Sequence, residues 1–410
     1  MRNLHKKTIY EALGRESVHP FPARMAPGIA LDVMSSIDKS RVLDPMMGSG
    51  TVLAMARAKG HHGIGFDIDP LAVLISKVWT TAIDPTDVRD QACCVIGNAF
   101  AEFKNIALGD AYPDAADEET RQFIRYWFDG YARRQLTAIS LAIRILDCET
   151  TRNALWCAFS RLIISKQSGA SLAMDLSHSR PHRAFETAPE KPFNKFMLAV
   201  ERVISSSIDK KCPNRGTQPT IKMGDARKLE LPDRSVDLVL TSPPYLNAID
   251  YIRASKFSLV WMGYSIGQLR RVRSESVGTE ASRQPALDDN REIKAIIDSL
   301  KLRPKLENRH EQILAKYIHD MRGAISEVGR VLSTTGKAVY VIGENTLRST
   351  YIRTSVIVLK LAELAGLSMK ERLIRTLPAN RRYMPPPSAG HRGGMIEARM
   401  RREVVLTFAK

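Results

Sequence analysis

The sequence predicts an α/β protein with a Rossmann-like, doubly wound, mostly parallel sheet and a large helical insertion. Three observations lead to this prediction. Short apolar runs alternate with amphipathic segments early and late in the chain, which is typical of strands joined by crossover helices. Several of these runs end in acidic or glycine-rich residues, at the place where open α/β sheets hold their ligands. Between residues 98 and 216 the apolar residues recur at helical spacing.

The composition favours a large folded protein with a polyanionic partner. The chain has 410 residues, of which 44% are hydrophobic, so it can bury a large core and divide into two or three domains. Its formal net charge is +17. An excess of this size favours nucleic acid as a partner. A basic soluble protein without such a partner is the alternative interpretation.

Cysteine usage and the absence of long apolar runs exclude several classes. None of the five cysteines forms a Cys-x-x-Cys pair, so neither a zinc site nor a disulfide framework is expected, and no metal is predicted. Free thiols are typical of a reducing cytoplasm, which is the predicted location. The N-terminal segment lacks the apolar core of a signal peptide, and no apolar run approaches membrane-spanning length. A membrane partner is therefore not expected.

The first part of the predicted core covers residues 1–97. A strand at Val42–Asp44 leads through a glycine-rich loop into a helix at Thr51–Lys59. A second strand at Gly63–Asp67 leads into a helix at Pro70–Thr80. This order of elements predicts one parallel βαβ unit followed by the next helix.

Residues 98–217 form the predicted helical insertion. Phe123, Trp127 and Tyr131 recur at helical spacing, and further apolar residues continue the pattern. Pro192 suits the first turn of another helix. This segment separates the two parts of the predicted core.

The remainder of the core is predicted to cover residues 218–410. Residues 265–310 are polar and charged, which predicts an irregular, partly mobile segment. The other elements are predicted in this order: strands at 220–225 and 235–242, a helix near 248–263, an amphipathic helix at 313–332, a buried strand at 336–343, and strands near 367–375 and 403–408.

The ends of three predicted strands carry residues suited to a nucleoside site. Gly48 and Gly50 allow a tight turn and a close backbone approach. Asp67 ends the second strand, where an acid typically binds ribose hydroxyls, and Asp225 follows the third strand as an acceptor for an adenine amino group. The loop is not G-x-G-x-x-G and no lysine follows it, so a nucleoside without a pyrophosphate fits better than NAD or ATP. Each acid, taken alone, also suits a helix cap or a turn.

Four motifs together resemble those of the amino-methylating DNA methyltransferases, which use S-adenosylmethionine and have the class I methyltransferase fold. The motifs are "DPMMGSGT" (44–51), "GFDID" (65–69), "GDA" (224–226) and "TSPPY" (241–245). In addition, "HPFPARMAP" (19–27) resembles the segment that lines the methionine end of the cofactor in that family. The resemblance covers residues 15–82, 218–262 and 313–345. The helical segment at 98–217 is a departure, because the third strand of the family usually follows the second closely. The resemblance implies this segment as a candidate target-recognition region.

The resemblance implies S-adenosylmethionine as the cofactor. The contact residues that it implies come from the N-terminal segment, the glycine loop and the acidic strand ends: Phe21, Ala23, Arg24, Asp44, Pro45, Gly48, Ser49, Gly50, Thr51, Asp67, Asp69, Asp225 and Ala226.

The stretch from Ser242 to Tyr245 suits the binding of one extruded base. An exocyclic amine is a poor nucleophile because its lone pair delocalises into the ring, and two acceptors for its hydrogens would hold the nitrogen closer to sp³. The Ser242 hydroxyl and the Pro243 carbonyl are the candidate acceptors, and Pro243 and Pro244 stiffen the loop. Tyr245 can stack on a flipped base. The alternative is a proline-rich turn that only ends the strand.

The resemblance implies a sequence-specific DNA methyltransferase, with cytosine N4 as the favoured target. Family members with Ser first in this tetrapeptide mostly modify cytosine, whereas adenine enzymes more often carry Asp or Asn. Three alternatives stay open: an adenine-N6 DNA methyltransferase, an RNA methyltransferase on the same fold, and a DNA-binding protein with a non-catalytic methyltransferase-like core.

Double-stranded DNA is the predicted partner, and a cognate restriction endonuclease is a candidate second one. The loop "SLAMDLSHSRPHR" (171–183) is the most polar part of the insertion, and "GQLRRVRSE" (267–275) is a rival recognition element. The C-terminal region is rich in arginine, which suits phosphate contacts. The candidate contact residues are Ser177, His178, Arg180, Arg183, Arg270, Arg271, Arg381, Arg382, Arg401 and Arg402.

Overall fold

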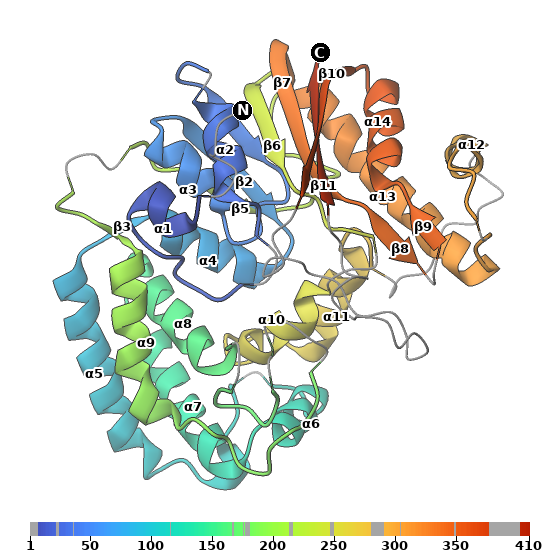
Figure 1. The fold of residues 1–410 in the computed structure, drawn as a ribbon. Coiled ribbons are helices and arrows are strands. Elements are labelled where there is room, and N and C mark those ends of the chain that lie inside the picture. The colour runs from blue at the N-terminus through green and yellow to red at the C-terminus, as the bar shows by residue number, and fades with distance from the viewer. Residues whose placement is uncertain are drawn as a thin grey trace.

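The computed structural model confirms the predicted α/β fold (Figure 1). It describes residues 7–21, 24–35, 37–114, 116–165, 168–174, 176, 181–212, 216–246, 250–279, 291–303, 305–347, 350–376 and 402–410. A seven-stranded sheet lies in the upper part of the molecule in this view, and the helices between residues 85 and 206 lie below it.

The seven strands lie in the order β10-β11-β7-β6-β1-β2-β5. Every neighbouring pair is parallel except the two pairs that involve β11, which runs against both β7 and β10. The carboxyl ends of the other six strands therefore share one edge of the sheet with the amino end of β11. The strands are β1 (Arg41–Asp44), β2 (His62–Asp67), β5 (Thr220–Met223), β6 (Val236–Thr241), β7 (Leu332–Gly343), β10 (Ser368–Thr376) and β11 (Arg402–Ala409).

Helices cover both faces of the sheet, as the alternation of its apolar residues requires. On one face Val42 packs with residues of α2 (Pro27–Met34) and α3 (Thr51–Ala58). On the other face the neighbouring Leu43 belongs to a core that α13 (Asn308–Val331) and α14 (Thr354–Leu364) complete. A strand turns successive side chains to opposite faces, so the sheet is doubly wound.

The predicted helical segment is confirmed, and it begins earlier than residue 98. Strand β3 (Ala82–Ile83) pairs in parallel with β4 (Ile208–Asp209), so the chain enters and leaves the segment side by side. Among the residues described between these two strands are five α-helices, and Pro192 occupies the first turn of the last one, as predicted. They are α5 (Pro85–Phe103), α6 (Glu118–Trp127), α7 (Gly130–Arg144), α8 (Glu149–Ile163) and α9 (Pro192–Ser206), and a 3₁₀ turn at Leu108–Asp110 precedes α6.

The prediction of an irregular segment at 265–310 is wrong for the part that the structure describes. Helix α11 (Ile266–Glu275) begins at a capping box between Ser265 and Gln268. Helix α12 (Arg291–Ser299) buries three isoleucines at helical spacing, and α13 already begins at Asn308. The low overall apolar content concealed these elements, because a cap and one apolar stripe suffice for a short packed helix.

The remaining elements are short or lie around the site. Helix α4 (Pro70–Thr80) follows β2, and α10 (Tyr251–Leu259) follows the loop after β6. Helix α1 (Ile9–Leu13) lies near the N-terminus, and β8 (Asn345–Leu347) pairs with β9 (Thr350–Ile352) as a hairpin. Among the residues that the structure describes, no helix is both long and apolar enough to cross a membrane.

Candidate active site

The glycine loop after β1 is fastened to the end of β2. Gly48 and Gly50 have φ angles of 51° and 83°, in the left-handed region that glycine adopts without strain. The Gly48 N–H donates to Asp67 Oδ2 over 2.8 Å, and the Asp69 N–H donates to Asp67 Oδ1 over 2.9 Å. Both oxygens of Asp67 thus hold backbone amides at the carboxyl edge of the sheet.

Two buried carboxyl groups follow each other at this strand end. Burial raises the pKa of Asp67, and hydrogen bonds from backbone N–H groups partly offset that rise. Asp69 caps α4, accepting from the Leu71 N–H over 2.9 Å, and also accepts from Ser255 Oγ of α10 over 2.6 Å. Burial raises the pKa of Asp69 to about 7. Helix α10 is therefore tied directly to the end of β2.

One hydrogen bond joins the glycine loop to the Thr-Ser-Pro-Pro-Tyr loop. Thr241 Oγ1, at the end of β6, donates to Asp44 Oδ1, at the end of the neighbouring strand β1, over 2.8 Å. The Met46 N–H donates to the same oxygen over 3.2 Å. Burial is the main reason why the pKa of Asp44 rises to about 7. Two motifs that lie about 200 residues apart in the sequence thus meet at one edge of the sheet.

The raised pKa of Asp44 predicts a pH-dependent stability. The folded chain keeps the Asp44 proton to about pH 7, whereas an unfolded chain loses it near pH 4. The stabilisation is therefore complete below about pH 4 and is lost as the pH rises through about 7. We expect Asp44→Asn, whose Oδ1 can still accept both bonds, to gain up to about 4 kcal/mol relative to wild type over that range. Urea unfolding at pH 4, 5.5 and 7 measures the difference, and a constant difference would contradict the assignment.

Aromatic side chains form one wall beside the glycine loop. The rings of Phe21 and Tyr251 stack with centroids 5.6 Å apart and an interplanar angle of 6°. A Cβ atom at Gly48 would lie 3.6 Å from the Phe21 ring. Burial and the nearby charges of Asp67 and Asp69 raise the pKa of Tyr251. Sequence reasoning missed Tyr251, although its position in the first turn of the helix that follows the Pro-Pro loop was an available signal.

The N-terminal segment that carries Phe21 is held by buried polar contacts. His19 Nε2 lies 2.9 Å from Ser160 Oγ of α8, and Ser160 donates to Ser258 Oγ of α10 over 2.9 Å. Burial lowers the pKa of His19 well below its ordinary value, so the ring is neutral. Arg24 donates to Ser17 Oγ over 2.5 Å and to the His19 carbonyl, so its guanidinium braces this segment. Ala23 lies outside the described residues.

Asp225 lies at the same edge, but Arg227 engages its carboxylate. Arg227 Nη2 donates to Asp225 Oδ2 over 2.6 Å, and its Nη1 donates to Asp320 Oδ1 of α13 over 2.7 Å. Asp320 in turn forms a buried ion pair with Lys316. A ligand amino group would therefore share the Asp225 oxygens with Arg227. The Gly224 N–H donates to the Asp67 carbonyl over 3.0 Å, which brings this strand end beside β2.

The Ser-Pro-Pro-Tyr loop begins directly after the Asp44–Thr241 contact. Ser242 and Tyr245 are half-buried and Pro243 is buried. The Tyr245 hydroxyl donates to Glu403 Oε1 of β11 over 3.2 Å. The other predicted cofactor residues Pro45, Ser49, Thr51 and Ala226 are buried, and Thr51 Oγ1 has no hydrogen-bond partner within the part of the chain that the structure describes.

The predicted DNA contacts are only partly described. Arg183 lies over the Tyr126 ring of α6, 5.5 Å from its centroid, and Arg270 pairs with Glu119. Arg271 and Arg402 are exposed. Arg183 and Arg402 do not lie on the same element: Arg183 packs beside α6, and Arg402 is the first residue of β11. Outside the described residues lie Ser177, His178, Arg180, Arg381, Arg382 and Arg401.

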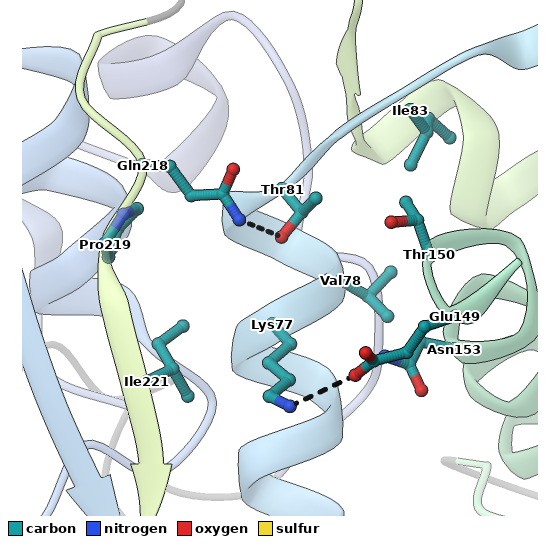
Figure 2. A pocket seen from close by; sticks show the side chains of 10 residues that line it. All are labelled: Lys77, Val78, Thr81, Ile83, Glu149, Thr150, Asn153, Gln218, Pro219 and Ile221. Carbon is teal, nitrogen blue, oxygen red and sulfur yellow. Dashed lines mark hydrogen bonds and ion pairs between the residues drawn. The ribbon is translucent and has the colours of Figure 1, made fainter.

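The hollow drawn in Figure 2 lies away from these strand ends. Its walls come from the last turns of α4, the start of α8 and the residues that enter β5. Lys77 Nζ pairs with Glu149 Oε1 over 3.4 Å, and Gln218 Nε2 donates to Thr81 Oγ1 over 3.5 Å. The site residue Asp69 caps the opposite end of α4, about 16 Å away at 1.5 Å per residue. Across the described part of the chain, no three His, Cys, Asp or Glu residues are grouped to hold a metal ion.

Comparisons with known proteins point to one class of enzyme. No protein-family model matches the chain. The chain is 23% identical to the type II methyltransferase M.MvaI of Kocuria varians over 412 residues, which cover 95% of this chain and 89% of that protein. It is 22% identical to the type II methyltransferase M.BsoBI of Geobacillus stearothermophilus over 334 residues, 75% of this chain and 64% of that protein. These relatives confirm the resemblance that the motifs indicated, at the level of type II methyltransferases.

Among solved structures, a SAM-dependent methyltransferase from Methanosarcina mazei is similar to the chain. The identity is 9%, the TM-score is 0.32, and the match covers 92% of this chain and 96% of that one.

Proposed function

We propose that the chain is a site-specific DNA methyltransferase that transfers a methyl group from S-adenosylmethionine to the exocyclic amine of a flipped base, with cytosine N4 as the target. The observation that carries this proposal is the Asp44–Thr241 hydrogen bond of 2.8 Å. It joins a loop suited to a nucleoside to a loop suited to a base amine. The experiment that tests the proposal is transfer of a labelled methyl group from S-adenosylmethionine to DNA by the purified chain.

The residues at the strand ends fit the cofactor. Gly48 brings the backbone close to the Phe21 ring, which a Cβ atom there would touch, and Thr51 Oγ1 at the start of α3 is a buried polar atom without a hydrogen-bond partner among the described residues. Asp67 is placed to accept from ribose hydroxyls, and Asp225 from the adenine amino group. The stacked rings of Phe21 and Tyr251 offer an aromatic wall to a cationic centre. When bound, S-adenosylmethionine supplies an activated methyl group on a sulfonium, so no general base is assigned.

Asp67 is expected to contribute most among the acids to cofactor affinity. Asp67→Ala should weaken S-adenosylmethionine binding by about 1–3 kcal/mol, the usual cost of losing a buried charged hydrogen-bond partner. Part of the loss would come from the Gly48 and Asp69 amides that Asp67 holds. Asp67→Asn keeps one carbonyl acceptor and should lose less. Calorimetry on folded variants measures both affinities, and an unchanged affinity of the alanine variant would refute this role.

The Ser-Pro-Pro-Tyr loop supplies the contacts to the base. Ser242 Oγ and the Pro243 carbonyl accept the two amino hydrogens and hold the nitrogen toward the methyl carbon. Pro243 and Pro244 fix the loop before the base arrives, so little ordering remains to be done at the moment of reaction. Tyr245 stacks on the base, which must leave the duplex to reach the site.

Cytosine N4 is proposed over adenine N6 on the identity of Ser242. A carboxylate accepts more strongly than a hydroxyl, whereas a serine can also donate to a neighbouring ring acceptor such as cytosine N3. Adenine N6 is the second candidate, because its amine also lies beside a ring nitrogen.

Double-stranded DNA is proposed to lie across the helical segment and the carboxyl edge of the sheet. The net charge of +17 supports a polyanionic partner. Arg183 over Tyr126 and the exposed Arg271 are described basic side chains available to phosphates. The helical segment at 98–217 acts in target recognition, with the arginines of the C-terminal region as phosphate contacts. A cognate restriction endonuclease is a proposed functional partner.

A further inference from the structure

Tyr245 reaches across the sheet edge to a residue of a distant strand. Its hydroxyl lies 3.2 Å from Glu403 Oε1. Strand β7 separates β6, which leads into the Ser-Pro-Pro-Tyr loop, from β11, which carries Glu403. The contact therefore joins two elements that are not neighbours in the sheet. No sequence motif predicts this contact.

The reversed direction of β11 explains how Glu403 comes to this edge. Because β11 is antiparallel to both neighbours, its amino end meets the carboxyl ends of β7 and β10. In the ladder Glu403 stands opposite Gly343 of β7 and Arg375 of β10. A parallel strand at this place would bring its carboxyl end to the site instead.

Arg375 orients the Glu403 carboxylate. Arg375 Nη1 lies 3.5 Å from Glu403 Oε2, and the two side chains are only 10% and 14% exposed. One carboxylate oxygen thus faces an arginine and the other faces the Tyr245 hydroxyl. The Arg375 charge therefore favours the ionised form of Glu403, which is the form that accepts from Tyr245.

The environment of Tyr245 sets the direction of its hydrogen bond to Glu403. Burial and the Glu403 charge raise the pKa of Tyr245 well above its ordinary value, so the phenol stays protonated and donates to the carboxylate.

We propose that Glu403 is a positioning residue for methyl transfer, acting through a relay in which Glu403 accepts the hydrogen bond from the Tyr245 hydroxyl and Tyr245 in turn contacts the base. The relay fixes the place of the Tyr245 ring on which the base stacks. The inference rests on the proposed function, since it concerns how Tyr245 receives the base. Glu403 itself does not touch the base.

A double-mutant cycle tests the relay. We expect Glu403→Ala and Tyr245→Phe each to slow single-turnover methyl transfer by about 10-fold to 100-fold, the effect of a small misplacement at a reacting centre. The affinities for cofactor and DNA should stay near those of wild type. The double variant should be no slower than the slower single variant, because both changes break one chain of bonds. Glu403→Gln, which keeps a carbonyl acceptor for Tyr245, should recover much of the rate.

The control is Glu371→Ala on the neighbouring strand β10, where the carboxylate is exposed and the rate should be that of wild type. Multiplicative losses in the double variant, or a Glu403→Ala variant as fast as wild type, would overturn the inference. Ultraviolet titration of the Tyr245 phenol separates this result from the proposed function. Its pKa should fall in Glu403→Ala even if wild type transfers no methyl group to DNA, and an unchanged titration would also overturn the relay.

Discussion

Replacing Ser242 by alanine is expected to slow methyl transfer by about 10²-fold to 10³-fold, the cost of removing one pre-placed hydrogen-bond partner of a reacting group in other enzymes. The amine would keep only the Pro243 carbonyl as an acceptor, and its nitrogen would no longer be held toward the methyl carbon. The cofactor contacts lie on other strand ends, so cofactor affinity should be nearly intact.

Single-turnover rates with saturating cofactor and DNA measure the effect of Ser242→Ala directly. Ser299→Ala is a matched control, because it removes a half-buried serine hydroxyl of α12 that donates only to a carbonyl of its own helix and lies outside the base-binding loop. A Ser242→Ala variant that transfers methyl groups at the wild-type rate would contradict the proposed role of Ser242 as an acceptor of the base amine. A variant that loses cofactor affinity instead would show that Ser242 belongs to the cofactor site and not to the base-binding loop.

Replacing Gly50 by alanine is expected to cause the largest loss of stability. A Cβ atom at Gly50 would lie 2.2 Å from Ser76 Oγ and 2.9 Å from Ser76 Cβ, so the loop and α4 could not both keep their places. The φ angle of 83° adds backbone strain for any residue with a side chain. Overpacking and strain together should lower the free energy of unfolding by about 2–5 kcal/mol. Cofactor affinity should fall with it.

Gly60 supplies a matched control for the strain of the left-handed backbone conformation. Its φ of 80° is close to that of Gly50, but a Cβ atom there would meet nothing within 4 Å. Gly60→Ala should therefore cost only about 1–2 kcal/mol. Adding Ser76→Ala to Gly50→Ala removes the closest contact and should recover part of the loss. Equal denaturation midpoints for Gly50→Ala and Gly60→Ala would show that the collision with Ser76 does not occur.

The sequence predicted the parts of the fold that depend on local patterns. The strands that end at Asp44 and Asp67 and the helix Pro70–Thr80 are confirmed, because apolar runs, glycines and helix-start residues mark them locally. The helices at 266–275 and 291–299 were missed, because their apolar residues are few and their stability comes from caps and packing partners elsewhere in the chain.

The candidate site divides in the same way. The glycine loop, Asp67 and the Ser-Pro-Pro-Tyr loop each follow a predicted strand, so the shared edge of a parallel sheet sufficed to bring them together. The contacts of Tyr251 with Phe21 and of Tyr245 with Glu403 join residues far apart in sequence. The first depends on the packing of the N-terminal segment against α8 and α10, and the second on the strand order and the reversed direction of β11. Asp225 and Arg227 are only two residues apart, but their ion pair was not predicted, because Asp225 was considered only as a ligand contact.

The modified nucleoside is the most direct test of the central claim. The purified chain should be incubated with S-adenosylmethionine and unmethylated genomic DNA, and in a parallel reaction with cellular RNA. The nucleic acids are then digested, and the nucleosides are analysed by mass spectrometry. The account predicts N4-methylcytosine from DNA, at a level that Ser242→Ala reduces sharply. N6-methyladenine without N4-methylcytosine would contradict the assignment to cytosine, and methylation of RNA alone, or of no exocyclic amine, would contradict the proposed function.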